Sequence, residues 1–186
     1  MEELELYMDA AIEGMESAIA HLNRELGKIR AGKASPSMLD SVKVDYYGVI
    51  SPISQVANVT TPDAKTIFIQ PWDKSVLPII EKAIMQANLG FNPANNGEVI
   101  RIIVPPLTEE RRLQLAKQVK ALGENAKITV RNQRRDAIEE FKKLKKDGLS
   151  EDLAKDAEGN VHKIHEDYIK KVDEIVAIKE EELMTV

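Results

Sequence analysis

Hydrophobic residues recur at helical spacing along the first 30 positions of the chain. They follow one another at alternating steps of four and three, at Met8, Ile12, Met15, Ile19, Leu22, Leu26 and Ile29. This seam predicts a long helix over residues 3–29 that packs at a shallow angle on other helices. A self-associating coiled coil is the alternative interpretation of the same seam.

The pattern changes after residue 30. Segments 41–51, 53–61, 65–71 and 98–104 are rich in β-branched and alternating apolar residues and predict strands, with a turn at Gly48. Segment 75–90 predicts a short helix, with Pro78 in its first turn and Gly90 at its C-terminal cap. Together they predict a small α/β unit with a mixed sheet and one helix.

Helical spacing returns after Pro105 and Pro106. Thr108 can cap a helix that runs to Lys146, which at 1.5 Å per residue would be about 58 Å long. Ser150 can cap a last helix with one apolar face, made by Leu153, Ala157, Val161, Ile164, Tyr168, Val172, Ile175, Lys179 and Leu183. Only the aliphatic stem of Lys179 would pack there.

These elements predict an α+β protein with two domains. Residues 1–30 and 106–186 form an elongated three-helix bundle, and residues 31–105 form an inserted α/β domain. The chain crosses between them twice, which predicts a two-strand hinge with Gly32, Ser35 and Pro36 on one side and Pro105 and Pro106 on the other. Because each proline fixes its φ at about −65°, the second crossing should be the stiffer of the two. The alternative is that Pro105 and Pro106 only end a strand.

Positive charge is concentrated on the long helix of an acidic chain. The net charge of the chain is −5, yet residues 101–146 hold 13 Lys and Arg against six Asp and Glu. On a helix of 3.6 residues per turn, nine of these cations fall within an arc of about 120°. This cationic stripe comprises Lys117, Lys120, Lys127, Arg131, Arg134, Arg135, Lys142, Lys145 and Lys146. The apolar residues of the helix cluster on another face.

A row of cations with few carboxylate partners suits a phosphate backbone. The alternative is a solvated face whose charges pair with carboxylates. The segregation of charge favours nucleic-acid contact.

The sequence offers little for an enzyme. It has no GxxxxGK[ST] loop and no GxSxG elbow, so we expect neither GTP binding nor hydrolase chemistry, and no cofactor. His162, His165 and Glu166 could share one helical face, but two histidines at this spacing are more often surface residues, and we expect no metal site. Tyr46 and Tyr47 are interpreted as strand packing.

Composition adds to these exclusions. The chain has no Cys, no apolar run approaching the roughly 20 residues that span a membrane, and an acidic N-terminus unlike a secretory signal. We therefore expect a cytoplasmic protein without membrane contact. A mature organellar form is the alternative.

Four segments in order resemble the ribosome recycling factor family: GKIRAGKASPSMLD, EKAIMQANLGFNP, PPLTEERR and VRNQRRDA. The resemblance implies a three-helix bundle with a hinged α/β domain in an L-shaped outline. It also implies a monomer that binds the post-termination ribosome through large-subunit ribosomal RNA. With elongation factor G and its GTP hydrolysis, such a protein splits the ribosome into subunits and releases mRNA and tRNA.

The resemblance also implies which residues bind RNA. The family's principal contacts fall on Arg131, Arg134 and Arg30, with Arg112 and Arg135 as further candidates. Trp72 departs from the residue expected there. Two other classes of function stay open on the residues alone, a general RNA-binding protein and a small-molecule enzyme that uses the inserted domain.

Overall fold

The computed structural model describes residues 2–185, which form two compact units. One unit, called here the bundle, joins the chain up to Arg30 to the chain from Glu109 onward. The other, called here the inserted unit, is Ala31–Thr108. No helix in the described part of the chain is long and apolar enough to cross a membrane.

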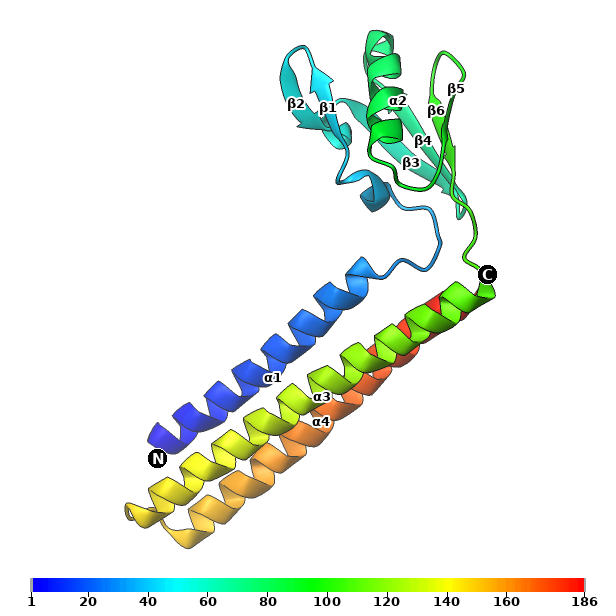
Figure 1. The fold of residues 1–186 in the computed structure, drawn as a ribbon. Coiled ribbons are helices and arrows are strands. Elements are labelled where there is room, and N and C mark those ends of the chain that lie inside the picture. Colours follow the sequence, from blue (N-terminus) through cyan, green and yellow to red (C-terminus); the bar gives the residue numbers. More distant parts are fainter. Residues whose placement is uncertain (1, 186) are drawn as a thin grey trace. The chain divides into compact units, whose positions relative to one another are not determined.

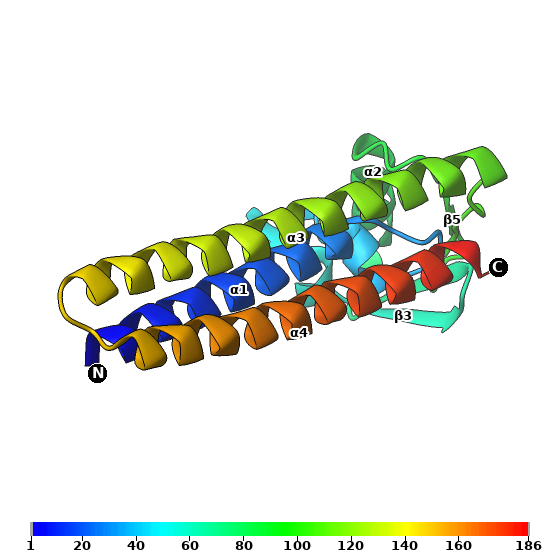
Figure 2. The same ribbon diagram turned by 90° about the horizontal axis from the view of Figure 1, so that it is seen from below.

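The bundle consists of α1 (Glu2–Lys28), α3 (Glu109–Lys146) and α4 (Glu151–Met184). They run side by side, with α3 antiparallel to the other two (Figures 1 and 2). Gly148, with a φ of +111°, ends the turn after α3, and the Ser150 hydroxyl accepts a hydrogen bond of 3.3 Å from the Leu153 amide. The predicted cap at Ser150 is thus confirmed.

Small residues occupy much of the core of the bundle. On α1 the buried side chains are Ala11, Met15, Ala18, Leu22 and Leu26, whereas Met8, Ile12 and Ile19 of the predicted seam are only partly buried. On α3, a Cβ added at Gly123 would lie 2.5 Å from a methyl group of Val176 on α4. The helices therefore approach closely at positions where the sequence provides Ala or Gly. The predicted seam, which contains large apolar residues only, does not include these positions.

The inward face of α4 also differs from the prediction in two places. Leu153 is partly exposed while Ala154 beside it is buried. His165, interpreted above as a surface residue, is buried with 8% of its surface exposed. His165 stands four residues after Val161 and three before Tyr168, both buried, so helical spacing alone places it in the core row.

The inserted unit has two sheets. β1 (Lys43–Tyr46) and β2 (Val49–Pro52) form a hairpin. The larger sheet has the order β3-β4-β6-β5, from β3 (Ala57–Asp63), β4 (Thr66–Pro71), β5 (Pro93–Asn95) and β6 (Ile100–Ile103). Helix α2 (Leu77–Gln86) and the short 3-10 turns η1 (Pro36–Leu39), η2 (Ile53–Gln55) and η3 (Lys74–Val76) complete the unit. Its core includes Ile67, Ile69, Ile80, Ile84, Ile100 and Ile102.

Every strand pairing in the described residues is antiparallel, so the prediction of a mixed sheet is wrong. Strands β4 and β5, which are connected through α2, do run in the same direction. However, β6 lies between these two strands and pairs with both in the opposite direction. The strand predicted over 53–61 begins only at Ala57, because residues 53–55 form η2.

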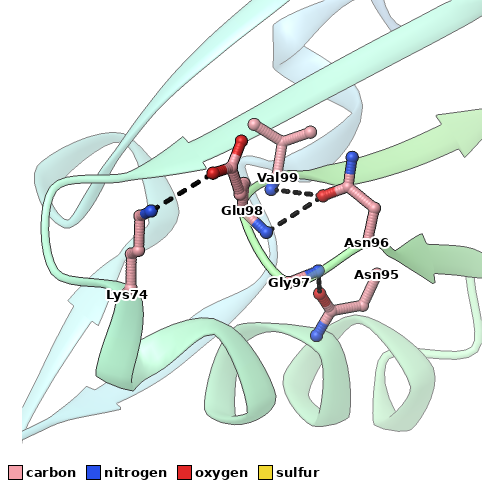
Figure 3. Close-up of polar contacts among 6 residues, drawn as sticks. All are labelled: Lys74, Asn95, Asn96, Gly97, Glu98 and Val99. Carbon is pink, nitrogen blue, oxygen red and sulfur yellow. Dashed lines mark hydrogen bonds and ion pairs between the residues drawn. The ribbon is translucent and has the colours of Figure 1, made fainter.

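The turn between β5 and β6 is held by its own side chains (Figure 3). The Asn95 side-chain oxygen accepts a bond from the Gly97 amide at 2.8 Å. The Asn96 side-chain oxygen accepts bonds from the amides of Glu98 and Val99, at 3.0 and 2.9 Å. The Lys74 ammonium lies 3.4 Å from the Glu98 carboxylate and links this turn to η3. The turn therefore keeps its shape without help from the bundle.

Candidate RNA-binding surface of the bundle

The cationic stripe on α3 divides into two rows. One row, called here the inner row, borders α4 and consists of Lys120, Lys127, Arg134 and Lys145. The Lys127 ammonium lies 2.5 Å from the Asp173 carboxylate, and this hydrogen bond raises the pKa of Lys127 above its usual range. Lys120 and Lys145 pair with Glu180 and Glu151 at 3.8 and 3.2 Å. Much of the inner row therefore joins α3 to α4.

Arg134 and His165 hold three of the four buried side-chain atoms that lack a hydrogen-bond partner among the described residues, and the fourth is the Glu180 Oε1. The Arg134 Nε and both ring nitrogens of His165 are buried without a hydrogen-bond partner among the described residues. Burial lowers the pKa of His165, and the charges of Arg134, His162 and Arg131 lower it further, while Glu166 opposes them. His162 stacks on His165 at 6.0 Å between ring centroids. The folded bundle therefore favours a neutral His165.

This depressed pKa predicts that the bundle loses stability as the pH falls. Below the ordinary histidine pKa of about 6.5 the unfolded chain takes up a proton that folded His165 resists. The free energy of unfolding should then fall with pH, by at most about 1.4 kcal/mol per pH unit for one proton. Urea denaturation between pH 7 and 5.5 should show a smaller decline for His165→Gln than for the wild type. The exposed His162→Gln is the control, and equal declines in all three proteins would contradict the prediction.

The remaining cations form the outer row: Lys117, Arg131, Arg135, Lys142 and Lys146. All five are exposed, and none takes part in an ion pair within residues 2–185. Arg131 and Arg135 stand four residues apart and so lie one above the other on the helix surface. This row presents charge to solvent without an ion-pair partner among the described residues, an arrangement that suits phosphate binding.

The five arginines predicted to bind RNA do not form a single patch. Arg131 and Arg135 belong to the outer row, whereas Arg134 is half-buried in the inner row. Arg112 is half-buried in the first turns of α3, about 28 Å from Arg131 along the helix at 1.5 Å per residue. Arg30 is exposed just after the end of α1. Contact with all five would require an extended ligand.

Of the predicted hinge residues, some lie in the folded inserted unit and others in the connecting segments. Ser35 and Pro36 belong to the η1 turn, where the Ser35 hydroxyl accepts a bond from the Ser37 amide. The Ala34 and Val104 amides donate to the carbonyls of Ala64 and Lys65, at 2.8 and 2.7 Å. Both crossings are thus attached to the β3–β4 turn, and residues 31–33 and 105–107 lie outside helices and strands.

Gly32 and Leu107, one from each crossing, lie against each other. Gly32 has a φ of +74°, which residues with a side chain rarely adopt. A Cβ at this position would lie 2.8 Å from the Leu107 Cγ. Glycine is therefore required at this position both by backbone conformation and by space.

No group of three potential metal ligands occurs among the described residues. The sequence profile of the ribosome recycling factor family matches residues 22–184. The chain belongs to this family. The resemblance stated above is confirmed, and the protein is a translation factor rather than an enzyme.

Full-length relatives agree with this assignment. The chain is 57% identical to the ribosome-recycling factor of Flavobacterium psychrophilum, over 100% of this chain and 99% of that one. It is 54% identical to the ribosome-recycling factor of Bacteroides fragilis, over the whole of both chains. The solution structure of a ribosome recycling factor matches with a TM-score of 0.76 and 38% identity, over all of both chains.

A second solved structure contains a family member bound to a ribosomal complex. It describes the Thermus thermophilus ribosome recycling factor and the Escherichia coli elongation factor G bound to the Escherichia coli post-termination complex. It matches with a TM-score of 0.61 and 40% identity, over 98% of this chain and 99% of that one.

Proposed function

We propose that this protein binds the post-termination ribosome and, with elongation factor G and its GTP hydrolysis, splits it into subunits and releases mRNA and tRNA. The observation that carries the proposal is the full-length match to ribosome recycling factors, on a chain whose α3 presents an unneutralised outer row of cations. The cytoplasm, where ribosomes act, is the proposed place of action.

Within this function, the bundle is proposed to hold large-subunit ribosomal RNA. Arg131 and Arg135 are exposed and suited to direct phosphate contacts. Arg134 is proposed to contact RNA from the edge of the α3–α4 interface, with Arg30 and Arg112 as contacts nearer the start of α3. A half-buried guanidinium loses less side-chain freedom on binding, which favours a contribution from Arg134.

Sedimentation of post-termination ribosomes tests the function directly. Incubation with this protein, elongation factor G and GTP should convert intact ribosomes into separate subunits. Omission of GTP or of elongation factor G should abolish the conversion. A general RNA-binding protein would instead bind ribosomes without any GTP-dependent loss of the intact particle, and that result would overturn the proposal.

We propose further that the bundle and the inserted unit act as two domains joined by a two-strand hinge, with boundaries near residues 30 and 106. The attachment of Ala34 and Val104 to the β3–β4 turn supports a pivot within residues 30–33 and 105–108. Ser35 and Pro36 then belong to the folded inserted unit, while Gly32, Pro105 and Pro106 lie within the pivot. In this proposal, the bundle stays on RNA while the GTPase displaces the inserted unit.

Replacement of Pro105 and Pro106 by Gly is expected to broaden the range of distances between the two domains. Each proline restricts φ, and glycine removes that restriction. Fluorophores on Ser54→Cys and Asn160→Cys, in a chain with no other cysteine, would report the distance distribution. Splitting should decline more than ribosome binding does. An unchanged distribution together with unchanged splitting would show that these prolines do not restrict the hinge.

A further inference from the structure

A second surface of the bundle has the features of a binding site. A groove of about 450 Å³ runs between α1 and α3. Its polar walls come from Ser17, His21 and Arg24 on α1 and from Asn125, Thr129 and Gln133 on α3. Its floor is apolar and includes Ala18, Leu22, Leu122 and Ala126. The volume falls within the range of small-ligand sites, and an apolar floor with polar walls suits a flat ring that carries polar groups at its edge.

One polar side chain of this groove has a partner, since the Thr129 hydroxyl donates to the Asn125 carbonyl at 3.2 Å. Among the described residues, none of the other five polar side chains makes a hydrogen bond or an ion pair. The groove between α3 and α4 offers a contrast, since its Lys120 and Lys127 pair with Glu180 and Asp173. The hydrogen-bonding capacity of the α1–α3 groove is therefore available to a ligand.

The groove contains no carboxylate, although the chain has 31 Asp and Glu. The hydrogen bond from Lys28 at 2.7 Å lowers the pKa of the neighbouring Glu25, and the charges of His21 and Arg24 lower it slightly further, so this carboxylate already has a partner outside the groove. Arg24 thus gives the groove a positive charge, which favours an anionic ligand. Asn125 and Gln133 add amides that both donate and accept, as recognition of a base edge requires.

Gly14 makes room for one of these amides. A Cβ at Gly14 would collide with the side-chain amide of Gln133, so the absence of a side chain on α1 allows Gln133 to lie across the groove. Gln133 stands two residues from both Arg131 and Arg135, which on a helix places it about 160° around α3 from each of them. The groove and the outer row therefore lie on opposite flanks of α3.

We propose that the α1–α3 groove binds one unpaired nucleotide of ribosomal RNA, as a second contact separate from the outer row. Arg24 and His21 bind its phosphate, the apolar floor packs against the base, and Asn125 and Gln133 bind the base edge. The proposal rests on the proposed function, because the RNA concerned belongs to the ribosome. It gives the bundle sequence-dependent contacts that phosphate binding by the outer row cannot supply.

The first test measures the affinity of the full chain for large ribosomal subunits over a series of salt concentrations. The double variant Asn125→Ala, Gln133→Ala should bind about tenfold more weakly, with an unchanged salt slope because no charge is lost. Asn132→Ala, an exposed amide on α3 outside the groove, is the matched control and should bind normally. Unchanged affinity of the double variant would overturn the proposal.

A second variant separates binding from folding. Gly14→Ala should raise the thermal stability of the bundle, because Ala favours a helix and the end of a flexible glutamine can move aside. The same change displaces the Gln133 amide and should weaken binding several-fold. A protein that is more stable and yet binds as well as the wild type would contradict the role of Gln133.

Chemical probing identifies the occupant. An iron chelate attached to Asn23→Cys, an exposed α1 position beside the groove in a chain without other cysteines, should cleave ribosomal RNA at one confined place. A loss of affinity without any RNA cleavage would mean that a ribosomal protein occupies the groove, which would overturn the proposal. If the groove variants bind normally while the outer-row variant Arg131→Ala, Arg135→Ala binds weakly, the groove proposal alone fails. If the outer-row variant binds normally as well, the proposed function itself fails.

Discussion

The bundle without the inserted unit is expected to bind ribosomes with nearly the affinity of the whole protein and to split none of them. Every cation of the outer row belongs to α3, and the bundle has a core of its own that includes Met15, Val130, Phe141 and Val161. A chain in which a short Gly/Ser linker joins Arg30 to Glu109 should therefore fold and keep its RNA contacts. It lacks the unit on which we propose that the GTPase acts.

Two measurements check this expectation. Circular dichroism should show the helical content of a folded bundle, and sedimentation with elongation factor G and GTP should leave ribosomes intact. The shortened protein should also inhibit the whole protein, because it occupies the same site without leading to splitting. Splitting at the wild-type rate by the shortened chain would show that the inserted unit is not required for the action of the GTPase.

The double variant Arg131→Ala, Arg135→Ala is expected to bind ribosomes at least tenfold more weakly than the wild type at physiological salt. Both guanidinium groups are exposed and have no ion-pair partner among residues 2–185, so their loss should remove about two phosphate contacts and lower the slope of log affinity against log salt by about two. Folding should be unaffected, because neither side chain packs in the core.

Lys127→Met is the matched control for this variant. It removes one positive charge from the cationic stripe, against two in the double variant, and takes it from the inner row, where Lys127 is already bound to Asp173 and Glu124. We expect little change in the salt slope and a loss of stability below about 1 kcal/mol. Equal losses of affinity in the two proteins would show that the inner and outer rows do not differ in function.

The division into two rows separates what the sequence of α3 determines from what depends on packing against α4. Spacing along α3 correctly predicted a helix with separate apolar and cationic faces, because both follow from 3.6 residues per turn. It could not predict that Lys127 would meet Asp173, 46 positions further along the chain, since that contact depends on which helix packs beside α3. The inner row lies along one edge of the 120° arc, but the spacing of residues on α3 did not show which edge would border α4.

Small and polar residues in the core were the other source of error. Ala11, Ala18, Gly123 and His165 are buried, but none of them marks a core by hydrophobicity alone. Their burial follows from close approach between helices, which a single helix pattern does not contain. In the inserted unit, β6 lies between β4 and β5 for a similar reason: the order of strands is set by long-range pairing rather than by local sequence.

The ion pairs of the inner row have a consequence for how the two long helices are aligned. Lys120 and Lys127 are seven residues apart, and so are their partners Glu180 and Asp173, so that both pairs form in one alignment of the antiparallel helices. If α4 slid by one turn of four residues, Lys120 would face Val176 and Lys127 would face Ile169 in place of their carboxylate partners. Each pair contributes little to stability, yet together they penalise such sliding, which the small residues at the interface would otherwise tolerate. Substitutions at these four positions should therefore be accepted in evolution mainly as coordinated exchanges, while the outer row is constrained by its ligand alone.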